Sequence, residues 1–268
     1  MPASPHWSHS TSPDFSAVTD KTIAVLPVAA VEQHGPHLPL GTDAMIMEGY
    51  LARVMPLLPD DLDVRFLPLQ AVGTSNEHVA FPGTLSLQPD TFMRVIADLG
   101  ESIARAGCRR LVMLNSHGGN SSVLDIAARE LRLRHGMLVV TASWQRFGYP
   151  PGLFTAEELE HGIHGGDIET SLMLTFRPEL VRRDHIADFP PASLAMAREH
   201  TWLRAGRPAG FGWLAQDLSE SGAMGNASLA SAEKGEACAV HGAAAFVELL
   251  QDVLRFELAK PGSAPLSR

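Results

Sequence analysis

Three clusters of side chains that can bind metal ions stand out in this sequence of 268 residues. The first cluster places Glu32, His34 and Asp43 in a loop rich in glycine and proline, directly after the apolar run 23–30. Such a loop buries little apolar surface, so its polar side chains need another reason to be held in place. Carboxylates and imidazoles are ligands that Zn²⁺ and Mn²⁺ accept. Because each of its oxygens can bind one ion, Asp43 could bridge two metals.

The second cluster follows the strand-like segment 110–115 and begins with His117, which can bind a metal. Gly118 and Gly119 let the backbone approach a bound group closely, and Asn120 leads into a helix whose first N–H groups could hold an oxyanion. The alternative interpretation is a tight turn from strand to helix in which the histidine is incidental.

The third cluster contains His164 and Glu169, five residues apart. This is not the i, i+4 spacing that places two ligands on one face of a helix, so the two residues need not bind the same ion. One division of roles makes Glu169 a metal ligand and lets His164 transfer protons as a general acid. Asp167 could take the carboxylate role instead, or it could simply cap a helix.

Two more residues are candidates for contact with a substrate. His78 lies in a loop just before the segment 81–84, and Trp144 follows a strand-like segment and could line the mouth of a pocket. A loop role for His78 and a packing role for Trp144 are the alternatives. His37 and His161 lie near the clusters, and we assign them ordinary loop roles.

The elements that must position these clusters alternate between strand and helix, which predicts an α/β fold with helices on both faces of a mostly parallel sheet. Pro68 indicates an edge strand or the end of one. Residues 185–226 are irregular and are expected to cover the site or contact a neighbouring subunit. The expected strands are 23–30, 64–69, 110–115 and 137–142, and the expected helices are 43–55, 89–106, 121–134, a short one opened by 155–158, 167–176 and 230–258.

Composition narrows the class of protein. The length suits one domain, for which we expect residues 21–260, preceded by a flexible leader at 1–20 and followed by a tail at 261–268. A net charge of −9 without a dense Lys/Arg block argues against a nucleic-acid partner. We identify no secretory signal and no apolar run long enough to span a bilayer. With only two cysteines, Cys108 and Cys238, the chain suits a reducing cytoplasm.

Taken together, the motifs resemble those of the creatininase (creatinine amidohydrolase) family over residues 22–177. The resemblance implies a three-layer α/β/α fold, a dinuclear Zn²⁺ or Mn²⁺ site and often a homohexamer. The motifs that carry it are Glu32-Gln33-His34-Gly35-Pro36-His37-Leu38-Pro39, Gly41-Thr42-Asp43, Phe81-Pro82-Gly83-Thr84, His117-Gly118-Gly119-Asn120 and His164 with Glu169-Thr170-Ser171.

The resemblance implies four ligands, with Asp43 bridging the two ions; the other three are Glu32, His34 and His117. In creatininase itself a glutamate two places after the third-motif histidine completes the second metal, whereas this chain has Gly119 there. Either Glu169 fills that role or the second ion is weakly held.

We therefore expect a cytoplasmic metal-dependent amidohydrolase that cleaves a C–N bond of a small cyclic amide or formamide through a metal-bound hydroxide. His164 would be the general acid, and the chain would form a homo-oligomer that binds neither nucleic acid nor membrane. One alternative is a metallopeptidase that trims a modified peptide, as in mycofactocin maturation, which needs an open groove. Another is a catalytically silent metal-binding scaffold, an interpretation that Gly119 favours.

Overall fold

The computed structural model describes residues 5–258, and its centre is a parallel four-stranded sheet. The strands are β1 (Ile23–Val28), β2 (Val64–Phe66), β3 (Arg110–Asn115) and β4 (Leu138–Ser143), and their order across the sheet is β2-β1-β3-β4. All three strand pairs are parallel, so the carboxyl ends of the strands meet at one edge of the sheet.

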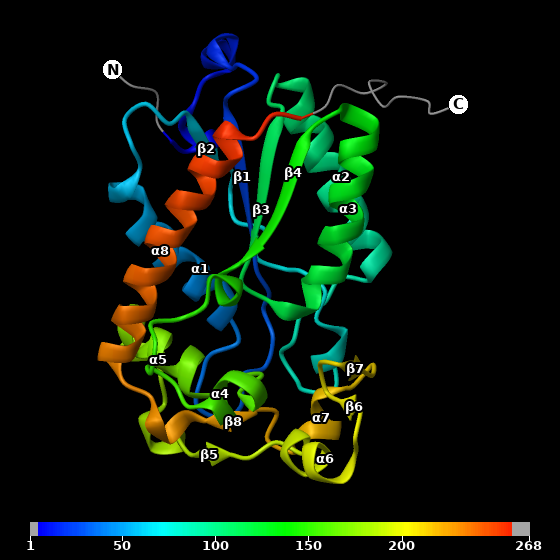
Figure 1. The fold of residues 1–268 in the computed structure, drawn as a ribbon, viewed down its shortest axis with the longest axis vertical. Helices are drawn as coiled ribbons and strands as arrows, with labels where there is room; N and C mark the ends of the chain where they lie inside the picture. Colours follow the sequence, from blue (N-terminus) through cyan, green and yellow to red (C-terminus); the bar gives the residue numbers. More distant parts are fainter. Residues whose placement is uncertain (1–4, 259–268) are drawn as a thin grey trace.

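Helices cover both faces of this sheet (Figure 1), which confirms the predicted three-layer α/β/α arrangement. Helices α1 (Thr42–Val54), α5 (Asp167–Phe176) and α8 (Ala232–Arg255) lie on one face, and α2 (Pro89–Arg105) and α3 (Ser121–His135) lie on the other. Successive β1 side chains alternate between the two cores, as the pleat of a strand requires. Ile23 and Val25 enter the first core, while Ala24 and Leu26 enter the second.

The strands differ from expectation mainly at their ends. Strand β1 stops at Val28, two residues early, because the Ala29 N–H bonds to the Gln70 carbonyl outside the regular ladder. Strand β2 ends at Phe66 and lies at the edge of the sheet, in agreement with the signal from Pro68. The helices keep their predicted positions to within three residues at each end, and α4 (Ala156–His161) begins where Thr155 accepts a hydrogen bond from the Glu158 N–H.

Short elements gather beyond the carboxyl ends of the strands (Figure 1). The segment 185–226, which was expected to be irregular, contains several of them. Trp213 and Met224 from this segment belong to a small apolar cluster together with Phe81 and Ile163. The elements of this layer, besides α4, are β5 (Asp188–Phe189), α6 (Ser193–Glu199), β6 (Leu203–Arg204), β7 (Ala209–Gly210), α7 (Ala215–Leu218) and β8 (Gly225–Asn226).

Helix α8 is long and apolar enough, by length and composition alone, to cross a bilayer. It packs instead against α1 and α5, with Phe246 and Leu250 fully buried, as the core helix of a globular domain does. Of the expected leader, the described part forms short 3-10 turns, and Trp7 and Val18 pack against the second core. The expected tail at 261–268 lies outside the described residues.

Candidate metal centre

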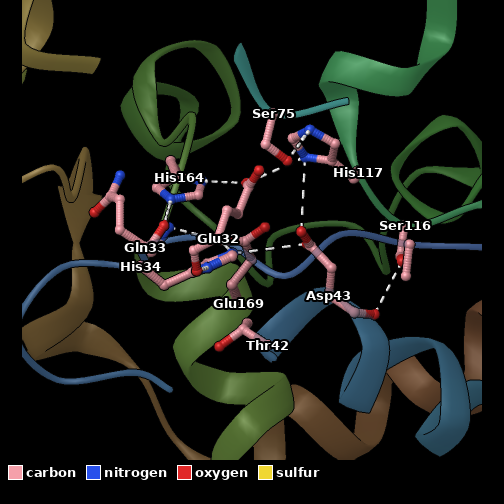
Figure 2. A network of polar contacts seen from close by, with 12 residues as sticks. Glu32, Gln33, His34, Thr42, Asp43, Ser75, Ser116, His117, His164 and Glu169 are labelled. Carbon is pink, nitrogen blue, oxygen red and sulfur yellow. Dashed lines mark hydrogen bonds and ion pairs between the residues drawn. The ribbon is translucent and has the colours of Figure 1, made fainter. Parts of the chain in front are cut away.

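The candidate site lies where the chain leaves two neighbouring strands. The loop after β1 carries Glu32 and His34, and the turn after β3 carries His117. Strand β2 lies next to β1 on one flank and β3 lies next to it on the other, so the strand order reverses direction at β1 and creates a topological switch point. Ligands of open α/β sheets bind at such points, beyond the carboxyl ends of the strands. Asp43 in the first turn of α1 and Glu169 in the first turn of α5 complete the group (Figure 2).

Two sets of three potential ligands share Asp43. In the first set, His117 Nδ1 lies 3.1 Å from Glu32 Oε1 and 3.6 Å from Asp43 Oδ2. In the second set, His34 Nε2 lies 3.6 Å from Asp43 Oδ1 and 3.8 Å from Glu169 Oε2. Asp43 therefore offers one carboxylate oxygen to each set, which is the arrangement required of a carboxylate that bridges two ions.

Backbone carbonyl groups orient both ligand histidines. His34 Nδ1 donates to the Glu32 carbonyl at 3.0 Å, and His117 Nε2 donates to the Thr74 carbonyl at 3.0 Å. A carbonyl can only accept, so in each neutral ring the other nitrogen keeps its lone pair and faces the carboxylates. Ligand histidines in metal sites are commonly held in this way by a second partner.

Several of these ligand atoms are buried without any hydrogen-bond partner. They include both carboxylate oxygens of Glu32, His34 Nε2 and Asp43 Oδ2. Glu32 is 0% exposed and His34 is 1% exposed, so solvent does not satisfy these atoms. Unpaired buried polar atoms are costly and rare in folded proteins. Because they converge as mixed oxygen and nitrogen donors, the residues present fit a divalent ion such as Zn²⁺ or Mn²⁺.

The same residues perturb one another electrostatically. Burial disfavours a charged ring at His34, but Asp43 and Glu169 overcome this and raise the pKa of His34 to about 9. Burial likewise opposes protonation of His117, and Glu32 and Asp43 raise its pKa to about 10. Burial raises the pKa of Glu169 to about 7. Without a cation, these acids and imidazoles share protons among themselves.

His164 lies beside the ligands. Its Nε2 donates to the Gln33 carbonyl at 2.5 Å, and its Nδ1 lies 3.7 Å from Glu32 Oε1. The ring stacks on His78 and packs against His34 in a tilted arrangement, with centroid separations of 4.2 Å and 4.0 Å. Burial, with the neighbouring imidazoles, lowers the pKa of His164 well below its ordinary value. A neutral ring with a free Nδ1 therefore faces the cluster, and this nitrogen also lies within ligand range of Glu32 and His34.

A cavity of about 470 Å³ opens onto the cluster. Gly118, Gly119 and His78, which the sequence analysis names as candidates for contact with a substrate, line this cavity. The His78 ring is held by the side-chain amide of Gln33, which approaches its Nδ1 to 2.7 Å. Burial lowers the pKa of His78 to about 4.

Asn120 and Trp144 have other surroundings. The Asn120 amide donates to the Ala29 carbonyl and to the Asn115 side chain, and it accepts from the Thr74 N–H. Its polar atoms therefore connect neighbouring loops by hydrogen bonds. Trp144 is buried in the first core, where it stacks on Tyr50 at 4.1 Å, and it borders a smaller neighbouring cavity of about 120 Å³. Packing therefore accounts for most of the contacts of Trp144.

The remaining candidates lie in structural contacts. Asp167 pairs with Lys234 Nζ at 2.5 Å and accepts from Ser171, so it faces away from the cluster that Glu169 joins. His37 bonds to the Thr170 hydroxyl at 2.9 Å, and His161 bonds to the Ser193 hydroxyl at 3.0 Å. These contacts agree with the ordinary roles expected for the two spare histidines.

Glu77 and Trp213 are among the cavity residues that the sequence analysis did not single out. Glu77 directly precedes His78, and its Oε1 is 3.5 Å from His117 Nε2. Burial raises the pKa of Glu77. Trp213 comes from the segment that was expected to cover the site, and it does line the cavity. A carboxylate and a tryptophan in loops are ordinary in sequence, so only the fold identifies these two residues.

Comparison with known proteins gives consistent matches. The family model for creatininase, described as creatinine amidohydrolase, matches residues 8–250. A creatinine amidohydrolase of Pseudomonas putida is 34% identical over 233 residues, covering 80% of this chain and 83% of that protein. A mycofactocin precursor peptide peptidase of Mycolicibacterium smegmatis is 32% identical over 216 residues, covering 80% and 78%. A solved structure of creatininase with Mn superposes with a TM-score of 0.74 at 28% identity, covering 95% of this chain and 100% of that one.

Proposed function

This chain belongs to the creatininase family, and on that premise we propose that it is a dinuclear metal-dependent amidohydrolase acting on a small cyclic amide or formamide. The observation that carries this proposal is the convergence of buried, unpartnered ligand atoms from Glu32, His34 and Asp43 beside a cavity. A structural polar cluster would satisfy such atoms within the protein. Atoms left without partners in this way are typical of residues arranged for a bound cation.

The residues divide between two ions. Glu32, Asp43 and His117 would hold one ion, and His34, Asp43 and Glu169 would hold the other. Bound Zn²⁺ or Mn²⁺ would supply Lewis-acid chemistry, lowering the pKa of a water molecule and polarising a carbonyl oxygen. Glu169 then fills the place that Gly119 leaves open, which favours a complete second site over a weakly held one.

His164 is the residue that we propose moves the proton. Because its Nε2 hydrogen is donated to the Gln33 carbonyl, Nδ1 is the nitrogen free to accept. The ring would take a proton on Nδ1 from the attacking water and return it to the leaving nitrogen, acting as base and then as acid. Contacts with the His34 and His78 rings would hold its orientation.

The turn after β3 provides the remaining polar groups. Gly118 and Gly119 begin a 3-10 turn on the cavity wall, and the first N–H groups of a helical turn have no partner within it. These N–H groups could stabilise an oxyanion that develops on the substrate. His78 is positioned by Gln33, and its Nε2 lies 3.5 Å from Glu32 Oε1, so it would orient that ligand.

Metal analysis by elemental mass spectrometry tests the centre directly. The parent should hold about two Zn²⁺ or Mn²⁺ per chain, and Glu169→Gln should hold about one, because the second ion loses a ligand. Asp167→Asn is the matched control, since it changes a carboxylate of the same helical turn that pairs with Lys234, and it should keep both ions. A parent without metal after reconstitution would overturn the proposed function and favour a silent scaffold.

A peptidase is the second candidate, because a relative of similar identity is a mycofactocin precursor peptide peptidase. The two functions differ in the length of substrate that the cavity must admit. Phe211 and Trp213 of the covering segment line the cavity, which favours the small amides. Assays on formamides and cyclic amides, beside a series of peptides of increasing length, should show turnover of the small amides alone. Turnover that rises with peptide length would reverse this choice.

A further inference from the structure

Glu77 occupies space that exists only because residue 119 is glycine. A Cβ atom at position 119 would lie 2.3 Å from Glu77 Oε1, 2.5 Å from His117 Nε2 and 2.8 Å from the Thr74 carbonyl oxygen. Real Cβ atoms do not approach other atoms so closely, so any larger residue at 119 would displace the Glu77 carboxylate or the His117 ring. Gly119 and Glu77 therefore act as a pair that brings a carboxylate to the cavity wall.

When His117 is a neutral metal ligand, this carboxylate has no charged partner among the described residues that line the cavity. His117 Nε2 is 3.5 Å away and already donates its hydrogen to Thr74. The residues described as lining the cavity include no lysine and no arginine. Glu77 also lies beside Nε2 of His117, whereas the ligand carboxylates lie beside Nδ1, so Glu77 is outside both ligand sets. Its side chain is 20% exposed and faces the cavity.

The surroundings of Glu77 suit a positively charged group. Trp213 lines the same cavity, lies 6.5 Å from the neighbouring His78 ring, and donates its own N–H to the Ala205 carbonyl at 2.9 Å. The rest of the indole therefore offers aromatic surface, which attracts cations. A carboxylate and an indole that line one cavity, whose described lining holds no Lys or Arg, favour an ammonium or amidinium group over an anion.

We propose that Glu77 is a substrate-binding residue that accepts hydrogen bonds from a positively charged amino or amidino group next to the scissile amide. This proposal rests on the proposed function, since it places the reacting carbonyl at the metal centre. It narrows the substrate class from small amides in general to amides that carry a cationic nitrogen near the bond that is cleaved.

Two small hydroxamates of matched size test the proposal without requiring turnover. Glycine hydroxamate carries an ammonium group where glycolohydroxamate carries a neutral hydroxyl, and both present the same two hydroxamate oxygens to a metal ion. Binding to the Zn²⁺-loaded protein is measured by isothermal titration calorimetry. The parent should prefer glycine hydroxamate by about tenfold, the size expected for a partly buried charge-assisted hydrogen bond.

Two variants test whether Glu77 causes the preference for glycine hydroxamate. Glu77→Gln should bind both hydroxamates equally while keeping the affinity of the parent for glycolohydroxamate. Gly119→Ala should also lose the preference when it is compared with the parent at equal metal content, because the new methyl group would lie 2.3 Å from Glu77 Oε1 and 2.5 Å from His117 Nε2. Glu101→Gln, an exposed position on α2 with the same change in charge, is the control and should retain the preference of the parent.

The outcomes separate this inference from the proposed function. Equal binding of the two hydroxamates by the metal-loaded parent would overturn the role of Glu77 and leave the metal centre standing. A preference that survives Glu77→Gln would also overturn it. A parent that holds no metal would overturn the proposed function itself, and metal content is measured on every sample before titration.

Discussion

Metal binding to this protein should release protons, because the two ligand histidines are protonated in the metal-free chain near neutral pH. The carboxylates beside them outweigh burial and raise the pKa of His34 to about 9 and that of His117 to about 10. A metal ion needs the lone pair that each proton occupies. Each ion must therefore displace one proton, and binding should strengthen as the pH rises.

The magnitude follows from the number of protons. Both pKa values lie above pH 8, so between pH 7 and pH 8 each association constant should rise about tenfold per pH unit, which is about 1.4 kcal/mol per ion. The product of the two constants should rise about 100-fold over this interval. Glu169, with a pKa of about 7, also takes up a proton as the pH falls. The metal association constants should therefore depend more steeply on pH below neutrality.

The assay is calorimetric titration of metal-free protein with Mn²⁺ at pH 7.5 in two buffers that differ in ionisation enthalpy. The dependence of the measured heat on the buffer gives the protons released, and we expect about two per chain. His117→Ala should lower this number by about one. His37→Gln is the matched control, because burial and the charge of His34 lower the pKa of His37 to about 4 and leave it neutral. Proton release close to zero in the parent would refute the reasoning.

Three other expectations concern proton transfer and packing. His164→Ala should keep both metal ions but lose at least about 100-fold in turnover, as loss of a general acid–base group does; a parent-like rate on any substrate would contradict the assignment. Gly235→Ala should lower the free energy of unfolding in urea by about 3 kcal/mol through overpacking. The new methyl group would lie 2.0 Å from the Ser171 carbonyl oxygen. An unchanged urea midpoint would contradict this expectation. Lys234→Met should lower the free energy of unfolding by about 2 kcal/mol, because Asp167 would stay buried without its lysine partner. This figure allows for the partial exposure of the lysine. Its metal content should stay at the parent value.

The ligand cluster was accessible from the sequence because each member follows or begins a regular element. Glu32 and His34 follow β1, His117 follows β3, and Asp43 begins α1. Parallel strands bring their carboxyl ends to one edge, so polar residues after two such strands must lie close together. The motifs resembling a known family added Glu169 to the same group, and the structure places it 3.8 Å from His34 Nε2.

The choice between Glu169 and Asp167 could not be made from the sequence. Both residues lie in the first turn of α5, and residues two apart on a helix point about 200° apart around its axis. One of them must face the ligands and the other must face away, but the sequence does not show how the helix is rotated. Packing against α8 decides this, because Lys234 of α8 pairs with Asp167 and turns Glu169 toward His34.

The proximity of Glu77 to Gly119 could not be predicted from the sequence either. Position 119 is glycine where creatininase itself has a glutamate, and from the sequence alone this favours a weakened metal site or a silent scaffold. In the fold, the space left by the absent side chain at 119 is filled by the carboxylate of Glu77, from a segment 42 residues earlier (119 minus 77). The Glu77 carboxylate lies beside Nε2 of His117, whereas the Glu32 carboxylate lies beside Nδ1, so Glu77 borders the cavity and not the two candidate ligand sets. The sequence alone suggests inactivity from the missing carboxylate at 119, whereas the fold shows a second carboxylate, that of Glu77, on the cavity wall next to the same position.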